Sequence, residues 1–274
     1  MHILYATDGS DGALAAAQFL AGLQFQDSSV TILTVAADGD AGDQPLTAAC
    51  EVLGTRFSRV ETQVRYGHVA DQILQGAEEA RPDLVVLGSR GLGSSPRFFI
   101  GSVAERVARN ARSPVLVVRP SQCKLDRLVV GVDGSDFAEY VADWIWRLPL
   151  PERCEIFLVT VVAPRAESLT RSRASFSLAL RAEMTMILQL ERDQAQQRLE
   201  QLAAPFIVAG MRVVPLVRPD HPALGLLSVA GERRADLIVL GSHGLSALDR
   251  FLLGSVSEHV LRHATCSVLI ARKA

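Results

Sequence analysis

Apolar and polar positions alternate along the chain with two periods, which separates candidate strands from candidate helices. Residues 2–7 and 29–36 are short apolar runs, and residues 11–23 between them have the spacing of an amphipathic helix. DLVVLG at 83–88 is almost continuously apolar, which is typical of a strand buried on both faces. Strands that alternate with helices, without hairpin turn signals, predict right-handed crossovers and a doubly wound parallel sheet of the α/β class.

The rest of the chain follows the same alternation. In the first half the pattern predicts strands at 60–66 and 114–118 and helices at 48–59, 69–80 and 102–111. In the second half it predicts strands at 127–132, 155–162, 212–217, 236–241 and 267–271, and helices at 139–148 and 256–264. A further helix follows residue 183, with apolar positions at Met184, Ile187, Leu188, Leu199 and Leu202.

The two halves of the chain repeat one another. Three segments return in the same order: ATDGS at 6–10 as GVDGS at 131–135, GSRG at 88–91 as GSHG at 241–244, and residues 101–119 as residues 254–272. Such an ordered return indicates a tandem duplication. We therefore expect two domains of the predicted fold, one over residues 1–121 and one over residues 125–274.

The second repeat is longer than the first. Matching motifs lie 125 residues apart at first and 153 residues apart later, so 28 extra residues lie between Asp133 and Val217. Within this region, residues 165–183 are rich in serine and arginine; the arginines are Arg165, Arg171, Arg173 and Arg181. Three interpretations stay open: a solvated loop, a lid that carries arginines to a bound phosphate, and a docking surface.

Composition and charge place the chain among ordinary globular proteins. It has 274 residues with 49% hydrophobic and 21% charged positions, which excludes disorder as its dominant state. The formal net charge of −2 gives no electrostatic case for binding nucleic acid or an anionic membrane. The N-terminus soon turns polar, no apolar run reaches the length of a membrane span, and the four cysteines form no CxxC pair. These features predict a soluble cytoplasmic protein with reduced thiols.

Each half carries a glycine-rich loop after its fourth predicted strand, with the spacing G-x2-G-x9-G-S. The residues are Gly88, Gly91, Gly101 and Ser102 in the first half, and Gly241, Gly244, Gly254 and Ser255 in the second. Glycines let the backbone approach a ligand closely, and the last Gly-Ser opens a helix whose free N–H groups attract an anion. The loops therefore indicate two anion sites at the carboxyl ends of the strands. The alternative is that the glycines serve only tight turns.

At this point the sequence resembles the universal stress protein family, in its tandem, nucleotide-binding type. The resemblance covers nearly the whole chain, and it rests on the Asp-Gly-Ser ending of each first strand, the two glycine loops, and the SVAERV and SVSEHV helices. It implies a Rossmann-like, adenine nucleotide alpha hydrolase-like fold in a cytoplasmic stress-response or signalling protein that binds ATP with Mg2+. It also implies an internal pseudo-dimer that pairs through the final strands, a further homodimer, and an unidentified downstream protein partner.

The resemblance also assigns individual residues. Asp8 and Asp133 would lie at the nucleoside, and the backbone of Val35 and Val161 would contact adenine. From residue chemistry alone, both aspartates could instead be N-caps of the helices that follow.

At two positions of the motifs the residue type differs, either between the two repeats or from the family pattern. Arg90 and His243 occupy the same position in the two glycine loops, where a ligand contact and a surface role both stay open. Asp220 stands where the family usually has a glycine, so it would either repel phosphates or cap the next helix.

The sequence favours a binding protein over an enzyme. No P-loop GxxxxGK[ST] occurs, and neither glycine loop contains a lysine that would clamp phosphates during transfer. We therefore expect little or no hydrolysis and assign no catalytic residue. The alternative is an adenylating enzyme or a slow ATPase on the same fold. We assign no metal site either, because His259 and His263 form a pair without a third ligand.

The second loop yields a first prediction. Gly244→Asp would place a carboxylate and a Cβ where phosphate should lie, so we expect it to abolish nucleotide binding at the second site. Calorimetric titration of Mg·ATP measures the number of sites per chain. An unchanged stoichiometry in this variant would remove the second-site assignment.

Overall fold

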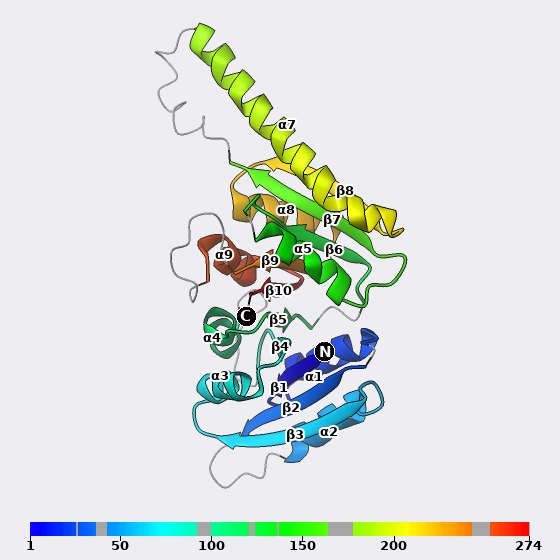
Figure 1. The fold of residues 1–274 in the computed structure, drawn as a ribbon. Coiled ribbons are helices and arrows are strands. Elements are labelled where there is room, and N and C mark those ends of the chain that lie inside the picture. Colours follow the sequence, from blue (N-terminus) through cyan, green and yellow to red (C-terminus); the bar gives the residue numbers. More distant parts are fainter. Residues whose placement is uncertain are drawn as a thin grey trace.

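In the described part of the chain, ten strands form one sheet with helices on both faces (Figure 1). The structure is a computed structural model that describes residues 1–25, 27–36, 43–91, 100–120, 124–135, 137–163, 178–242 and 253–273, with the backbone alone at 178–184. The strand order is β3-β2-β1-β4-β5-β10-β9-β6-β7-β8.

The first repeat supplies one half of this sheet and the second repeat the other. The elements of the first are β1 (His2–Thr7), α1 (Asp11–Gly22), β2 (Ser29–Ala36), α2 (Asp43–Leu53), β3 (Arg59–Tyr66), α3 (Val69–Ala80), β4 (Leu84–Gly88), α4 (Ser102–Asn110) and β5 (Val115–Val118). Those of the second are β6 (Arg127–Gly131), α5 (Ala138–Arg147), β7 (Glu155–Val162), α7 (Leu178–Val208), β8 (Arg212–Pro219), α8 (Pro222–Arg233), β9 (Leu237–Gly241), α9 (Ser255–His263) and β10 (Ser267–Ala271).

Within each half all neighbouring strands are parallel, so the predicted α/β class is confirmed. Successive strand residues face opposite layers, as the pleat requires. Ile3 and Tyr5 of β1 lie in the core that also holds side chains of α1, α2, α5 and α7. Leu4 and Ala6 lie in the core that also holds side chains of α3, α4, α8 and α9.

Three elements differ from the sequence-based predictions. The helix expected at 48–59 lies at Asp43–Leu53, because the chain leaves the helix at Gly54, whose N–H still bonds to the Cys50 carbonyl (2.8 Å). The helix expected after residue 183 begins earlier, at Leu178, inside the stretch assigned to a loop, lid or docking surface. Helix α8 was not predicted by the sequence analysis. Residues 164–177, and the expected domain junction at 121–123, lie outside the described residues, so these interpretations stay untested.

The two halves meet where β5 pairs with β10, and this pair is antiparallel. Val117 lies opposite Val268 and Leu116 opposite Leu269. Next to this seam, α4 and α9 exchange equivalent ion pairs: Arg109 with Glu258 (2.8 Å) and Arg262 with Glu105 (2.6 Å). Each pair is partly exposed and so contributes at most about 1 kcal/mol. Their equivalence shows that matching positions of the two repeats face each other across the seam.

Two buried arginines join the halves more firmly. Arg272, after β10, donates from its guanidinium to the carbonyls of Ala108 and Arg109 at the end of α4. Arg119, after β5, donates to the carbonyl of Leu261 near the end of α9 (3.2 Å). Burial lowers the pKa of Arg272 to about 10, which still leaves it charged at neutral pH. Each repeat therefore places a cation at the negative end of a helix of the other.

We expect Arg272→Met to lower the free energy of unfolding by about 2 kcal/mol, because two helix-end carbonyls lose a charged donor. Urea denaturation followed by circular dichroism measures the change. Arg112→Met is the matched control, since Arg112 is an exposed arginine that forms an ion pair with the exposed Glu78 (3.2 Å). That variant should stay within about 0.5 kcal/mol of the parent. Equal effects of the two substitutions would contradict a structural role for the buried guanidinium.

Candidate functional site

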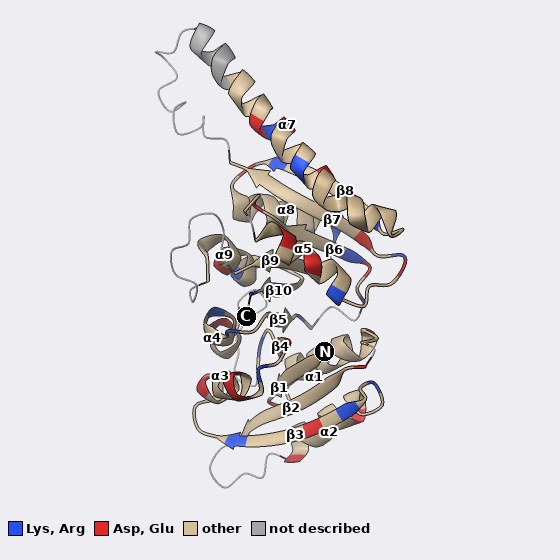
Figure 2. Cartoon of the chain, in the orientation of Figure 1, with Lys and Arg blue, Asp and Glu red and all other residues tan. Residues whose placement is uncertain are grey.

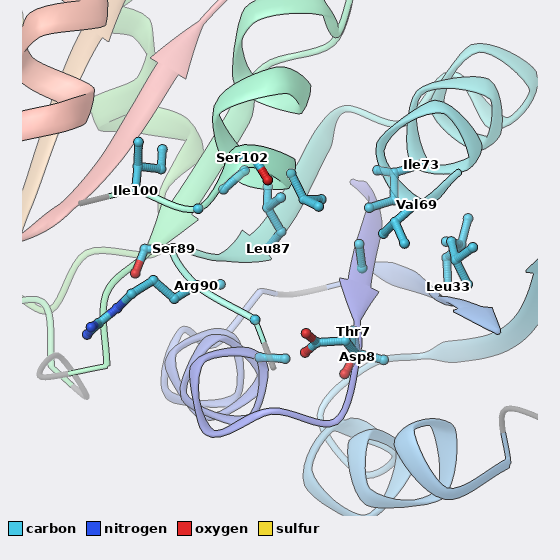
Figure 3. Close-up of a pocket in the computed structure, with 18 residues that line it drawn as sticks. Thr7, Asp8, Leu33, Val69, Ile73, Leu87, Ser89, Arg90, Ile100 and Ser102 are labelled. Carbon is cyan, nitrogen blue, oxygen red and sulfur yellow. The ribbon is translucent and has the colours of Figure 1, made fainter. Parts of the chain in front are cut away.

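A cavity of about 630 Å³ lies in the first half, at the carboxyl ends of β1, β2 and β4 (Figure 3). Parallel α/β sheets bind ligands at this edge, and the volume is that of a small-molecule site. The walls come from the end of β1, the first turn of α1, β2, the first turns of α3, the end of β4 with the loop after it, and the start of α4. One end of the cavity is apolar and the other is polar.

The apolar end consists of side chains from β2 and α3 (Figure 3). Leu33 and Val35 lie on one face of β2, and Val69 and Ile73 lie one helical turn apart on α3. Such a surface can cover both faces of a flat, weakly polar ring. Ile100, just before α4, also lines the cavity, but on the side of Ser89 and Arg90 (Figure 3).

The polar end contains the N-terminus of α4. Gly101 is the N-cap residue, and its own N–H donates to the Ser89 carbonyl (2.8 Å). Glycine has no side chain that could cap the helix, so the first-turn N–H groups of Ser102, Val103 and Ala104, which line the cavity, gain no side-chain acceptor from it. The partial positive charge of a helix N-terminus is therefore directed at the cavity.

Asp8 lies at the polar end, where its carboxylate faces the glycine loop (Figure 3). One carboxylate oxygen accepts a hydrogen bond from the Ser10 N–H (3.0 Å), and the other lies 2.2 Å from where a Cβ on Gly91 would be. The N-cap of α1 is Ser10, whose hydroxyl accepts from the Ala13 N–H (3.2 Å). The alternative that Asp8 caps this helix is therefore wrong.

Asp133, the equivalent residue in the second half, also accepts hydrogen bonds from the serine two residues later and is not the N-cap of the next helix. Its carboxylate accepts from the backbone N–H and the hydroxyl of Ser135 (3.1 and 2.6 Å). The N-cap of α5 is Phe137. Capping is therefore not the role of this aspartate either.

The glycines of the first loop have different reasons to be glycine. A Cβ on Gly88 would lie 2.5 Å from the Gly12 carbonyl oxygen, and one on Gly12 would lie 2.4 Å from the Arg90 carbonyl oxygen. These two glycines let the start of α1 pack against the end of β4. This packing reason differs from the tight turns that the sequence analysis left open as the alternative. Gly91 makes room for Asp8, whereas a Cβ on Gly101 would meet the Ser89 oxygen only at 3.4 Å.

Two further side chains define the surroundings of the cavity. Burial raises the pKa of Tyr5 to about 12, so its hydroxyl stays protonated and donates to the Ala13 carbonyl (2.6 Å), which ties α1 to the sheet. Arg90 lines the cavity, but its guanidinium extends away from Asp8 (Figure 3). The loop backbone, rather than this cation, faces the polar end.

The described part of the chain brings only some of the predicted residues of the second site together. Gly241 ends β9, Gly254 is the N-cap of α9 and Ser255 is its first residue. Asp133 and Val161 border a different groove, between α5 and α7. His243 and Gly244 lie outside the described residues, so the second site stays a prediction.

The second half also packs differently where the first has its cavity. Leu226, the equivalent of Ile73, lies 2.9 Å from where a Cβ on Gly131 would be. Val161 is equally close to the Cβ position of Gly225. Asp220 accepts a hydrogen bond from the N–H of His221, the N-cap of α8, so it supports the start of that helix.

The sequence analysis missed the apolar end of the first cavity. Leu33, Val69 and Ile73 were part of strand and helix patterns that any buried face would show, and Ile100 lay outside every predicted element. The one usable signal was the pair at positions 69 and 73, which places two branched side chains on the same helix face.

The described residues contain neither a metal-ligand cluster nor a membrane-spanning helix. Among them, no three His, Cys, Asp or Glu side chains gather as metal ligands do. Within the same residues, no helix is both long and apolar enough to cross a bilayer.

The geometry defines a class: a duplicated α/β protein with a ligand cavity between an apolar wall and a helix N-terminus. The model of the universal stress protein family matches residues 40–119 and 124–272. The chain is 30% identical over 241 residues to universal stress protein Rv2005c of Mycobacterium tuberculosis, covering 82% of this chain and 73% of that one. The chain therefore belongs to the universal stress protein family.

Two further comparisons agree with this assignment. Universal stress protein MJ0531 of Methanocaldococcus jannaschii is 26% identical over 157 residues, which covers 57% of this chain and 88% of that one. The crystal structure of a universal stress protein from Archaeoglobus fulgidus covers 100% of this chain and 98% of its own, with a TM-score of 0.67 and 17% identity. The latter likeness supports the fold of the whole chain.

The contacts around the glycines predict that some of them tolerate substitution by alanine better than others. We expect Gly88→Ala to lower the free energy of unfolding by about 2–3 kcal/mol, because the new Cβ would meet the backbone of α1. Gly101→Ala is the matched control and should cost less than about 1 kcal/mol, since its Cβ would meet no atom under 3.4 Å. Thermal and urea unfolding of both variants measure the difference. A tolerated Gly88→Ala would contradict the close packing of α1 on β4.

Proposed function

We propose that this protein is a cytoplasmic stress-response or signalling protein that binds an adenine nucleotide, with ATP as the ligand, in the cavity of the first half. The observation that carries the proposal is the union, in one cavity, of an apolar wall and an uncapped helix N-terminus. A nucleotide needs both, because its base is flat and weakly polar while its phosphates are anionic.

The base would lie between Val35 on β2 and Ile73 on α3. The end of a strand also offers backbone N–H and C=O groups, which can pair with the polar edge of adenine. This fits the role that the family resemblance gives to the backbone of Val35. Leu33 and Val69 would exclude water from the ring.

The phosphates would lie at the N-terminus of α4, near Gly91, Gly101 and Ser102. Asp8 would instead accept hydrogen bonds from ribose hydroxyls, because a carboxylate accepts from hydroxyls and repels phosphates. A Mg2+ ion bound to the phosphates would travel with the nucleotide, since the described residues around the cavity include no cluster of metal ligands.

Binding without appreciable hydrolysis is the second part of the proposal. Phosphoryl transfer needs cations around the transferred group and a group that orients the attacking water. Arg90 is the one Lys or Arg residue on the described cavity wall, and its guanidinium extends away from Asp8 (Figure 3). The nucleotide would therefore act by stabilising a conformation rather than by being consumed.

We also propose that residues 1–121 and 125–274 act as two domains that form an internal pseudo-dimer. The antiparallel pair β5–β10 and the reciprocal arginine contacts support this relation. A downstream protein partner would then read the nucleotide-bound state of the first domain.

Calorimetric titration of Mg·ATP into nucleotide-stripped protein tests the proposal. Ser102→Asp is the decisive variant: Ser102 is exposed at the first position of α4, where a carboxylate favours the helix but occupies the phosphate position. We expect affinity at the first site to fall by about 100-fold with no loss of stability.

Ser255→Asp at the matching position of α9 is the control. It should leave the first site unchanged and report whether the second loop contributes a site. In the parent, nucleotide at about a hundredfold excess over Kd should stabilise the fold by about 2.7 kcal/mol. Unchanged affinity in Ser102→Asp, or rapid phosphate release by the parent, would contradict the proposal.

A further inference from the structure

Helix α4 lies between the candidate anion site of the first half and a cation supplied by the second half. It has 9 residues and is therefore about 13 Å long. Its N-terminal turn, which begins at Ser102, lines the first cavity (Figure 3). At its other end, the carbonyls of Ala108 and Arg109 accept hydrogen bonds from the guanidinium of Arg272. An anion in the cavity and this cation would thus lie at opposite ends of one short helix.

Arg272 is a buried cation that no carboxylate of the described residues neutralises. It is 5% exposed, and its two hydrogen bonds go to helix-end carbonyls, while its Nε has no partner among the described residues. Burial lowers its pKa to about 10, and no nearby carboxylate of the described chain raises that pKa again. A buried charge is normally balanced by an opposite charge. Here the negative end of α4 takes that place, so a charge at the other end of the same helix also acts on the guanidinium.

Packing keeps the two ends of α4 in a fixed relation. At the start of the helix, the Gly101 N–H donates to the Ser89 carbonyl (2.8 Å). Along its length, Ala104, Val107 and Ala108 are buried in the core. The helix therefore cannot turn away from either end without losing this packing. Because a protein interior screens charge less than water does, an attraction across about 13 Å is still large enough to measure.

We propose that Arg272 is a positioning residue of the first ligand site: through α4, its buried charge strengthens the binding of phosphate groups at the N-terminal turn that begins at Ser102. The negative end of a helix favours a cation and the positive end favours an anion, so the two charges act on the same dipole in the same sense. They also attract each other directly. The first cavity is then completed by a residue of the second repeat. This inference rests on the proposed function, because it concerns the phosphates of the nucleotide.

Two other arginines show which features of Arg272 matter. Arg119 contacts the C-terminal part of α9 in the equivalent way, through the Leu261 carbonyl (3.2 Å), so the arrangement belongs to both repeats. Arg112 follows α4 in the chain, but its side chain is 71% exposed and forms an ion pair with Glu78. Water and this carboxylate screen its charge. Burial, rather than closeness to the end of α4 alone, therefore distinguishes Arg272.

The binding of a charged and an uncharged ligand to charge variants of Arg272 tests the proposal. Mg·ATP and adenosine share their base and ribose and differ in phosphate charge. Arg272→Gln removes the cation but keeps a hydrogen-bond donor, whereas Arg272→Lys keeps the charge. We expect Arg272→Gln to weaken Mg·ATP binding about fivefold or more and to leave adenosine binding within about twofold of the parent. Arg272→Lys should bind Mg·ATP within about twofold of the parent. Calorimetry at a temperature below unfolding measures both ligands.

Arg112→Met is the matched control, because it removes an exposed charge near the same end of α4, and it should leave Mg·ATP binding unchanged. Arg272→Met, which is neutral and has no donor, is a second variant and should weaken Mg·ATP binding as Arg272→Gln does. Equal losses for adenosine and Mg·ATP would mean a merely structural role and would overturn the proposal. So would unchanged Mg·ATP binding in both neutral variants, an equal loss in Arg112→Met, or an Arg272→Lys variant that binds as weakly as the neutral ones.

A cycle of variants without ligand separates this inference from the proposed function. Ser102→Asp places a fixed anion at the N-terminus of α4. Its effect on the midpoint of thermal unfolding should be about 2 °C more favourable with Arg272 present than in the Arg272→Gln background. If the parent binds neither Mg·ATP nor adenosine, the proposed function fails, and this cycle alone decides whether Arg272 acts on an anion through α4. Additive shifts in the cycle would overturn the inference, whether or not a nucleotide binds.

Discussion

The antiparallel pairing of β5 with β10 is the constraint on which the rest of the architecture depends. Because every other strand pair is parallel, the carboxyl ends of the two halves point toward opposite edges of the sheet. The two glycine loops, which follow β4 and β9, therefore start from opposite edges. The same pairing brings α4 and α9 side by side, where Arg272 and Arg119 each reach a helix end of the other repeat. A sheet that joins the repeats in this way fixes the orientation of one repeat relative to the other, and it keeps the carboxyl ends of their strands at opposite edges. Charged residues occur in both halves of the described chain (Figure 2).

Within the first half, one close approach shapes the cavity. The start of α1 lies so near the end of β4 that Gly12 and Gly88 leave no room for a Cβ. The Tyr5 hydroxyl also holds the first turn of α1, because it donates a hydrogen bond to the Ala13 carbonyl. This packing sets Asp8 against Gly91 and leaves the first turn of α4 facing the cavity. The polar end is thus built largely from backbone groups that the packing of α1, β4 and α4 already holds in place.

The sequence was informative where periodicity and repetition agreed. The strands at 2–7 and 29–36 and the helix at 69–80 lie where the pattern placed them, because buried strands and amphipathic helices leave strong signals. The spacing of the first glycine loop also located the polar end of the cavity. Other features depend on tertiary contacts. The apolar wall around Ile73 looks like ordinary core in the sequence, and the N-cap roles of Ser10 and Phe137 depend on local backbone geometry. Nor does any local pattern reveal that Arg272 is buried across the seam, since arginine is usually exposed.

The two repeats differ at two places: at the edge of the sheet that holds the cavity in the first half, and on the face that carries α5 and α7 in the second. In the second half, Gly131 and Gly225 replace Ala6 and Gln72, and this exchange lets Leu226 and Val161 approach the backbone. On the opposite face the insertion lengthens the helix after β7 and opens a groove beside α5. Once two copies of a domain share one sheet, only one of them must keep the ligand cavity. The other is released from that constraint, so its surface can change without loss of the first function. The asymmetry thus follows from duplication: the first half retains the cavity, and the second half is free to differ from it in packing and surface.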